Sequence, residues 1–145
     1  MTTRTAADNR AAADNTPATA GQALRSGLPG VLGEALDAGG PGRVLEFIDL
    51  FLESSGALVE AATGALRRGD LSAAAERSHT LRGNASAFDE EAVVTAAAEI
   101  ERAAGSGASS ERAAQMGAGL ETTFAAARAR LLEVRRHVAA ATARP

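Results

Sequence analysis

Apolar residues recur at helical spacing in four segments of this chain, and no segment alternates apolar and polar residues as a half-buried strand would. The segments run roughly over residues 43–68, 71–88, 90–104 and 110–138. Each segment carries one apolar stripe, which must be buried against a neighbour. Four amphipathic helices with short connections predict an all-α fold, namely an antiparallel up-down four-helix bundle.

The core of this bundle must be built from few large side chains, because alanine dominates the apolar fraction and aromatic residues make up only 3% of the chain. The large members of the apolar stripes are expected to be buried: Phe51, Leu58, Leu81, Phe88, Ile100, Leu120 and Phe124. Smaller or secondary members of the stripes include Val44, Phe47, Leu71, Ala74, Ser78, Ala85, Val93, Val94, Met116, Leu131, Val134 and Val138.

The N-terminal part of the chain differs from the rest. Residues 1–20 contain no periodic apolar pattern, which predicts a disordered tail and leaves residues 21–145 as one helical domain. A short N-terminal helix is expected over about residues 21–38, with a break near Leu28-Pro29-Gly30. The run Gly39-Gly40-Pro41-Gly42 should separate this helix from the bundle.

Two further positions look like helix boundaries. Gly69 suits the residue that follows the C-terminus of the first long helix, and Arg67 and Arg68 favour the negative end of its dipole. Asp89 is expected to be the N-cap of the third bundle helix, with Glu90 and Glu91 in its first turn.

Composition excludes several classes of protein. The net charge is only -3, and the 15 basic residues, all arginine, are scattered, which does not favour nucleic-acid binding. There is no cysteine, so disulfides and thiolate chemistry are excluded. The chain has no run of about 18 apolar residues and no apolar leader near its start, so neither a membrane span nor a secretory signal is expected. We therefore expect a cytoplasmic protein that does not bind membranes.

The residues that could carry chemistry are few. The two histidines, His79 and His137, lie far apart in the sequence, and without cysteine they do not predict a zinc site. No glycine-rich phosphate loop and no Gly-x-Ser-x-Gly elbow is present. An enzyme with its own active site, ATP site, metal or cofactor is therefore not expected.

His79 lies on the side of its helix that faces away from the apolar stripe. Arg82, Gly83 and Ser86 follow at +3, +4 and +7 and share its face, and Glu76 precedes it by three residues. A mostly neutral imidazole at pH 7 is a nucleophile, and a cation one turn away can stabilise an added phosphoryl group. Gly83 would let a partner approach the ring. We therefore interpret His79 as a phosphoacceptor, Arg82 as phosphate-stabilising, and Gly83, Ser86 and Glu76 as a partner-docking surface.

Simpler interpretations exist for each of these residues. A lone helical histidine is usually a surface residue, and a glycine in an alanine-rich helix can be incidental. Arg82 could pair with Ser78 or Glu76 across one turn. His137 follows Arg135 and Arg136 near the end of the last helix, where basic residues suit the helix dipole, so no function is assigned to it.

The segment from Ser78 to Ala85, Ser-His-Thr-Leu-Arg-Gly-Asn-Ala, resembles the signature of the histidine-containing phosphotransfer (HPt) family, Ala-His-x-Leu-Lys-Gly-Ser-Ala. His79 matches the phosphoacceptor, Arg82 the basic position and Gly83 the small position. The resemblance continues to Ile100-Glu101, similar to a Leu-Glu pair of the family. Departures are Ser78, Arg82 and Asn84 within the signature, and Asp89 where the family often has glycine.

The resemblance implies a function in two-component signalling. An HPt protein is a phosphorelay intermediate that takes a phosphoryl group from one response-regulator receiver domain and gives it to another, and a hybrid histidine kinase is an implied partner. Mg²⁺ would belong to the receiver, so the chain itself would need no cofactor. The alternatives are a helical module that binds receivers or another signalling partner without being phosphorylated, and a structural bundle whose histidine is incidental.

Overall fold

The computed structural model describes residues 24–143, and every long element in that range is helical. The helices are α3 (Gly30–Arg67), α4 (Leu71–Ala87), α5 (Glu91–Ser106) and α6 (Ser110–Thr142). The expectation of an all-α fold is therefore confirmed for the described residues. The predicted tail over residues 1–20 lies outside them. No helix in the described range is both long and apolar enough to cross a membrane.

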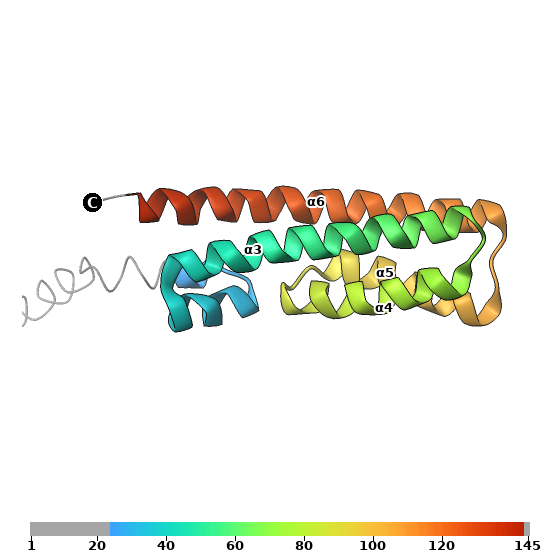
Figure 1. Ribbon diagram of the computed structural model, residues 1–145, viewed down its shortest axis with the longest axis horizontal. Coiled ribbons are helices and arrows are strands. Elements are labelled where there is room, and N and C mark those ends of the chain that lie inside the picture. Colours follow the sequence, from blue (N-terminus) through green and yellow to red (C-terminus); the bar gives the residue numbers. More distant parts are fainter. Residues whose placement is uncertain (1–23, 144–145) are drawn as a thin grey trace, which may run out of the picture.

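The two long helices form one side of the molecule and the two short helices the other. α3 packs against both α6 and α4, α5 packs against α4, and α5 also contacts α6. Figure 1 shows α3 and α6 side by side along the long axis, with α4 and α5 covering only part of that length. The N-terminal segment, residues 24–39, occupies the remaining length beside the short helices.

A kink at Gly40 allows the N-terminal segment to fold back. Gly40 has φ 74° and ψ −169°, a conformation that a residue with a Cβ rarely adopts, and Pro41 begins the straight part of α3. The predicted break within the run 39–42 is therefore confirmed. Pro29 is the N-cap of α3, after a turn in which the Leu28 N–H donates to the carbonyl of Arg25, so the predicted break near Pro29 is also present.

The turn from α3 to α4 follows from two residues. Gly69 has φ 76°, and the N–H groups of Gly69 and Asp70 donate to the carbonyls of Leu66 and Ala65, which satisfies carbonyls that the helix end would otherwise leave free. The Asp70 carboxylate then accepts from the Ala73 N–H at 3.1 Å and caps α4. This turn brings α4 back along α3.

Asp89 does not cap α5, and that expectation was wrong. The N-cap of α5 is Glu90, whose side chain makes no capping bond. Asp89 has φ 56°, in the left-handed region, and its carboxylate accepts from the Gly30 N–H at 2.8 Å. Aspartate tolerates this region better than most residues, which explains how it replaces the glycine common in the family. The Asp89 carboxylate thus caps the N-terminus of α3, which lies 59 positions earlier in the sequence.

The core contains most of the predicted large residues. Phe51 packs on Phe88 with ring centroids 4.3 Å apart and on Phe124 at 6.4 Å. Every member of the predicted set is buried except Leu58, which is half-buried, and Val59 is buried in its place. The stripe of α3 is centred on residues 55, 59 and 62, and Leu58 lies at its edge.

Four secondary stripe members are also only half-buried: Phe47, Leu71, Val94 and Val134. Conversely, Ser55 and Ser78 are completely buried, and Ser78 Oγ has no hydrogen-bond partner among the described residues. Leu32 of the N-terminal segment is completely buried too, so this segment forms part of the core.

Candidate functional site

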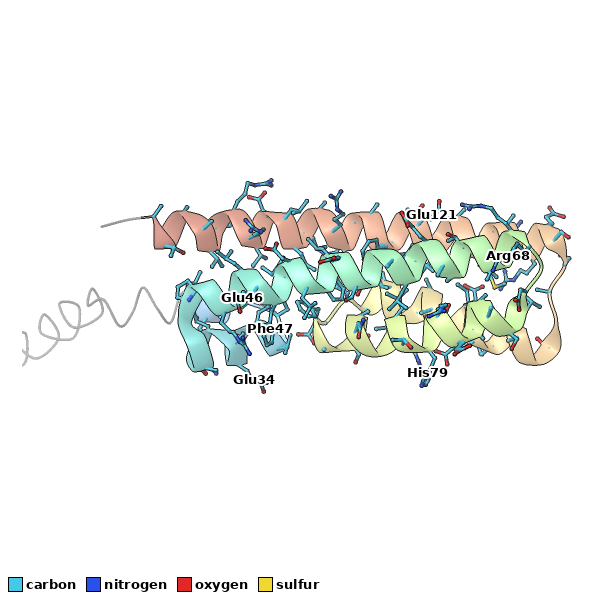
Figure 2. The ribbon with its side chains drawn as sticks, in the orientation of Figure 1. Glu34, Glu46, Phe47, Arg68, His79 and Glu121 are labelled. Atoms are coloured by element: carbon cyan, nitrogen blue, oxygen red, sulfur yellow. The ribbon has the colours of Figure 1, made fainter. Side chains whose placement is uncertain are left out.

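His79 lies in the middle of α4 on its solvent side, as the helical spacing predicted. Its neighbour Ser78 and the residue two positions on, Leu81, are fully buried, and the His79 side chain is 71% exposed. Figure 2 shows His79 pointing away from the bundle on the outer side of α4. The core contacts of α4 therefore fix the helix while leaving the imidazole open to a partner.

Arg82 lies beside His79, but its main partner is on another helix. The Arg82 Nη2 is 3.4 Å from His79 Nδ1, so the two residues share a face as expected. The Arg82 Nε lies 2.9 Å from Glu101 Oε1 on α5, an ion pair in which the N–H is not aligned as a hydrogen bond. The alternative partners considered for Arg82, Ser78 and Glu76, are not the ones it uses.

Glu101 is the residue of this site that the helical spacing could not identify. Its Oε2 is 3.4 Å from His79 Nδ1, and its side chain is only 22% exposed. It is 22 positions from His79 in the sequence, so only the packing of α5 on α4 brings the two together. The sequence feature that could have identified Glu101 is the pair Ile100-Glu101, which resembles the Leu-Glu pair of the HPt family.

The predicted docking residues lie on the exposed surface of α4. Glu76, Gly83 and Ser86 are all exposed. A Cβ added at Gly83 would have no atom within 4 Å, so nothing in the fold requires a glycine there and the space above this position is open. Gly83 therefore leaves open space next to His79, on the side of the ring toward the C-terminus of α4.

His137 does not join this site. It is on α6, 77% exposed, and its Nε2 is 3.9 Å from the Glu133 carboxylate one turn earlier. Among residues 24–143, no three His, Asp or Glu side chains are grouped as a metal site would require. Of the two histidines, His79 is the one whose ring nitrogen lies 3.4 Å from both a carboxylate and a guanidinium.

The two contacts at Nδ1 favour different tautomers of the imidazole ring. A carboxylate only accepts hydrogen bonds and a guanidinium only donates them, so Nδ1 can satisfy one of its two neighbours at a time. Glu101 favours a proton on Nδ1, while Arg82 remains held by the same carboxylate. With the proton on Nδ1, the lone pair is on Nε2, which is the nucleophilic nitrogen of a neutral ring.

Comparison with the models of known protein families gives a match. The family model described as the Hpt domain matches residues 46–138, which is well over half of the 145-residue chain. This range contains the straight part of α3 from residue 46 onward, α4, α5 and most of α6, and it includes His79, Arg82 and Glu101. Comparisons with curated proteins and with solved structures find no match.

Proposed function

Because the chain belongs to the Hpt domain family, whose members are phosphotransfer modules of two-component signalling, we propose that it carries a phosphoryl group on His79 between receiver domains. The observation that supports this most is an imidazole 71% exposed on a helix whose other face is buried, with a carboxylate and a guanidinium each 3.4 Å from its Nδ1. We also propose that the helices form an antiparallel up-down bundle that serves as a rigid support for this helix.

The proposed reaction begins with Nε2. Its lone pair forms a bond to phosphorus, the phosphorus–oxygen bond of the receiver's aspartyl phosphate breaks, and the aspartate carboxylate leaves with the electron pair. The ring keeps its proton on Nδ1 and becomes positively charged. Glu101, 3.4 Å from Nδ1, would stabilise that charge and hold the ring in one orientation. Transfer to the second receiver is the reverse reaction on a new aspartate.

The neighbours of His79 have different tasks in this proposal. Arg82 would leave part of its contact with Glu101 to face the new negative charge. Gly83 would allow the receiver surface to reach the ring, and Ser86 and Glu76 would border the docking surface. Catalysis would rest on positioning and electrostatics, and Mg²⁺ would be held by the receiver. The chain would thus act as a cytoplasmic phosphocarrier rather than an enzyme.

The test is phosphoryl transfer from a panel of phosphorylated receivers, with receiver binding measured separately. Wild type should gain phosphate, while His79→Gln should fold, still bind a receiver and gain none. His137→Gln is the matched control and should behave as wild type. If His79→Gln is labelled as well as wild type, His79 is not the acceptor. If wild type binds receivers but is never labelled, the non-phosphorylated binding module replaces this proposal.

Two further variants separate the neighbours' tasks. Arg82→Ala should slow transfer or shorten the lifetime of the phosphorylated form, because the cation beside the phosphate is lost. Gly83→Leu should weaken receiver binding while stability is kept or increased, since leucine has the better helix propensity and its Cβ meets nothing. Equal binding by Gly83→Leu and wild type would place the docking surface elsewhere.

A further inference from the structure

A second surface, unrelated to His79, lies between the two long helices. A groove of about 500 Å³ runs between α3 and α6, with Leu52, Gly56, Val59 and Phe124 among its apolar lining. Figure 2 shows Glu121, which also lines it, at the α3–α6 side of the molecule, whereas His79 points outward from α4. A molecule in this groove would therefore not cover the imidazole.

Gly56 opens the groove, and packing does not explain its presence. A Cβ at this position would have only the ring of Phe124 within 4 Å, at 3.8 and 3.9 Å, which is ordinary van der Waals contact. These distances leave room for the methyl group of an alanine. Alanine would also favour the helix, because a glycine inside a helix is less favourable than alanine. The consequence of glycine here is the open space above the Phe124 ring.

The borders of the groove are mainly acidic. Its lining includes three carboxylates, Glu53, Glu60 and Glu121, and one guanidinium, Arg128. Glu121 pairs with Arg67 at 3.2 Å, but the side chains of Glu53 and Glu60 make no ion pair within residues 24–143. These two glutamates are seven positions apart on α3, which places them on the same side of the helix about 10 Å apart along its axis, before and after Gly56.

From this arrangement we propose that the α3–α6 groove binds an amphipathic helix of a partner protein, with an apolar side chain over Gly56 and basic side chains against Glu53 and Glu60. A channel between two adjacent helices accepts a third helix by the usual ridge-and-groove packing. The unpaired carboxylates select a basic partner over an acidic one. A partner bound through such a helix stays attached to the domain while His79 remains accessible to a receiver domain.

The probe for the test is a synthetic amphipathic peptide of about 18 residues, roughly 27 Å of helix, with leucine on one face and lysine on the other. Binding to the full chain is measured by titration calorimetry and by backbone NMR shifts. The control peptides are a scrambled sequence of the same composition and a version with glutamate in place of lysine. We expect that, of the three peptides, only the basic amphipathic one binds. Its NMR shifts should be centred on Gly56, and its binding should be weaker at high salt.

The variants locate the binding. Glu53→Gln together with Glu60→Gln should weaken binding roughly tenfold, as loss of two exposed ion pairs would. Gly56→Leu should fill the groove and prevent binding without changing phosphoryl transfer. Glu91→Gln, an exposed carboxylate on α5, is the matched control and should bind as wild type.

Three results would overturn the proposal. The first is equal binding by all variants, which would indicate unspecific attraction of charge. The second is absence of binding, or preference for the acidic peptide. The third is a concentration-dependent dimer in sedimentation that Gly56→Leu abolishes, which would assign the groove to a second copy of the chain. None of these results bears on labelling of His79, so the two proposals fail independently.

Discussion

Asp89 combines an unfavourable backbone conformation with a favourable hydrogen bond, and substitutions separate the two contributions. Its φ is 56°, and its carboxylate accepts from the Gly30 N–H at 2.8 Å. A side-chain cap is worth about 1 kcal/mol. An alanine in the left-handed region costs about 1 kcal/mol more than a glycine, and aspartate lies between them.

These magnitudes predict an order of stability. Asp89→Ala loses the cap and gains strain, so it should destabilise by about 1.5 kcal/mol. Asp89→Gly loses the cap but relieves strain, so its loss should be about 0.5 kcal/mol. Asp89→Asn keeps an acceptor and tolerates the conformation, so it should also lose about 0.5 kcal/mol.

The assay is urea unfolding followed by circular dichroism, with the exposed Glu34→Ala as a control that should stay within about 0.5 kcal/mol of wild type. If the glycine and alanine variants were equally stable, the left-handed conformation of Asp89 would carry no strain. If asparagine were as harmful as alanine, the bond to Gly30 would not contribute to stability. Either result would refute the reasoning about this turn.

Three more predictions concern the core and one ion pair. Leu81 is fully buried, so Leu81→Ala should destabilise by about 2–5 kcal/mol in urea unfolding. Ser78→Ala should stabilise by about 1 kcal/mol in the same assay, because Ser78 Oγ is buried without a partner. The hydrogen bond from Arg135 lowers the pKa of Asp49, so Asp49→Asn should destabilise at pH 7, by at most about 1 kcal/mol for so exposed a pair.

The effect of Asp49→Asn on stability has a definite pH dependence. The folded-state pKa of Asp49 is lowered below its usual 3.8, so its contribution is present above about that pH and disappears as the pH falls through the folded-state value. Unfolding curves of wild type and Asp49→Asn should therefore converge in acid. A difference in stability that persisted in acid would assign the effect of Asp49→Asn to something other than ionisation.

The two core predictions have their own contradicting results. If Leu81→Ala lost less than about 0.5 kcal/mol of stability, the orientation of α4 would be wrong. If Ser78→Ala lost stability, the Ser78 hydroxyl would have a hydrogen-bond partner.

Features set by neighbouring residues were predictable from the sequence. The breaks at Pro29 and Gly40, and the turn at Gly69 that follows α3, depend on backbone conformations that proline and glycine favour locally. The outward direction of His79 followed from the spacing of Ser78, Leu81 and their stripe, since a helix turns by about 100° per residue. Residue type and periodicity were sufficient for each of these.

Features that depend on contacts between segments were not predictable in the same way. Asp89 looked like a cap for the helix that follows it, but the N–H that it accepts from is 59 positions earlier, at Gly30. Glu101 meets His79 only because α5 packs on α4. Leu58 was expected to be buried as a large member of its apolar stripe, whereas the position that faces the core is that of the smaller Val59.

The most direct test of the phosphoacceptor is the position of the label. The chain is incubated with a phosphorylated receiver, digested at neutral to alkaline pH, and its peptides are analysed by mass spectrometry. One phosphate should be found, on the peptide that contains His79, and it should be lost in acid, as a phosphorus–nitrogen bond is. Phosphate on His137, or an acid-stable phosphate on a serine or threonine, would contradict the assignment of His79.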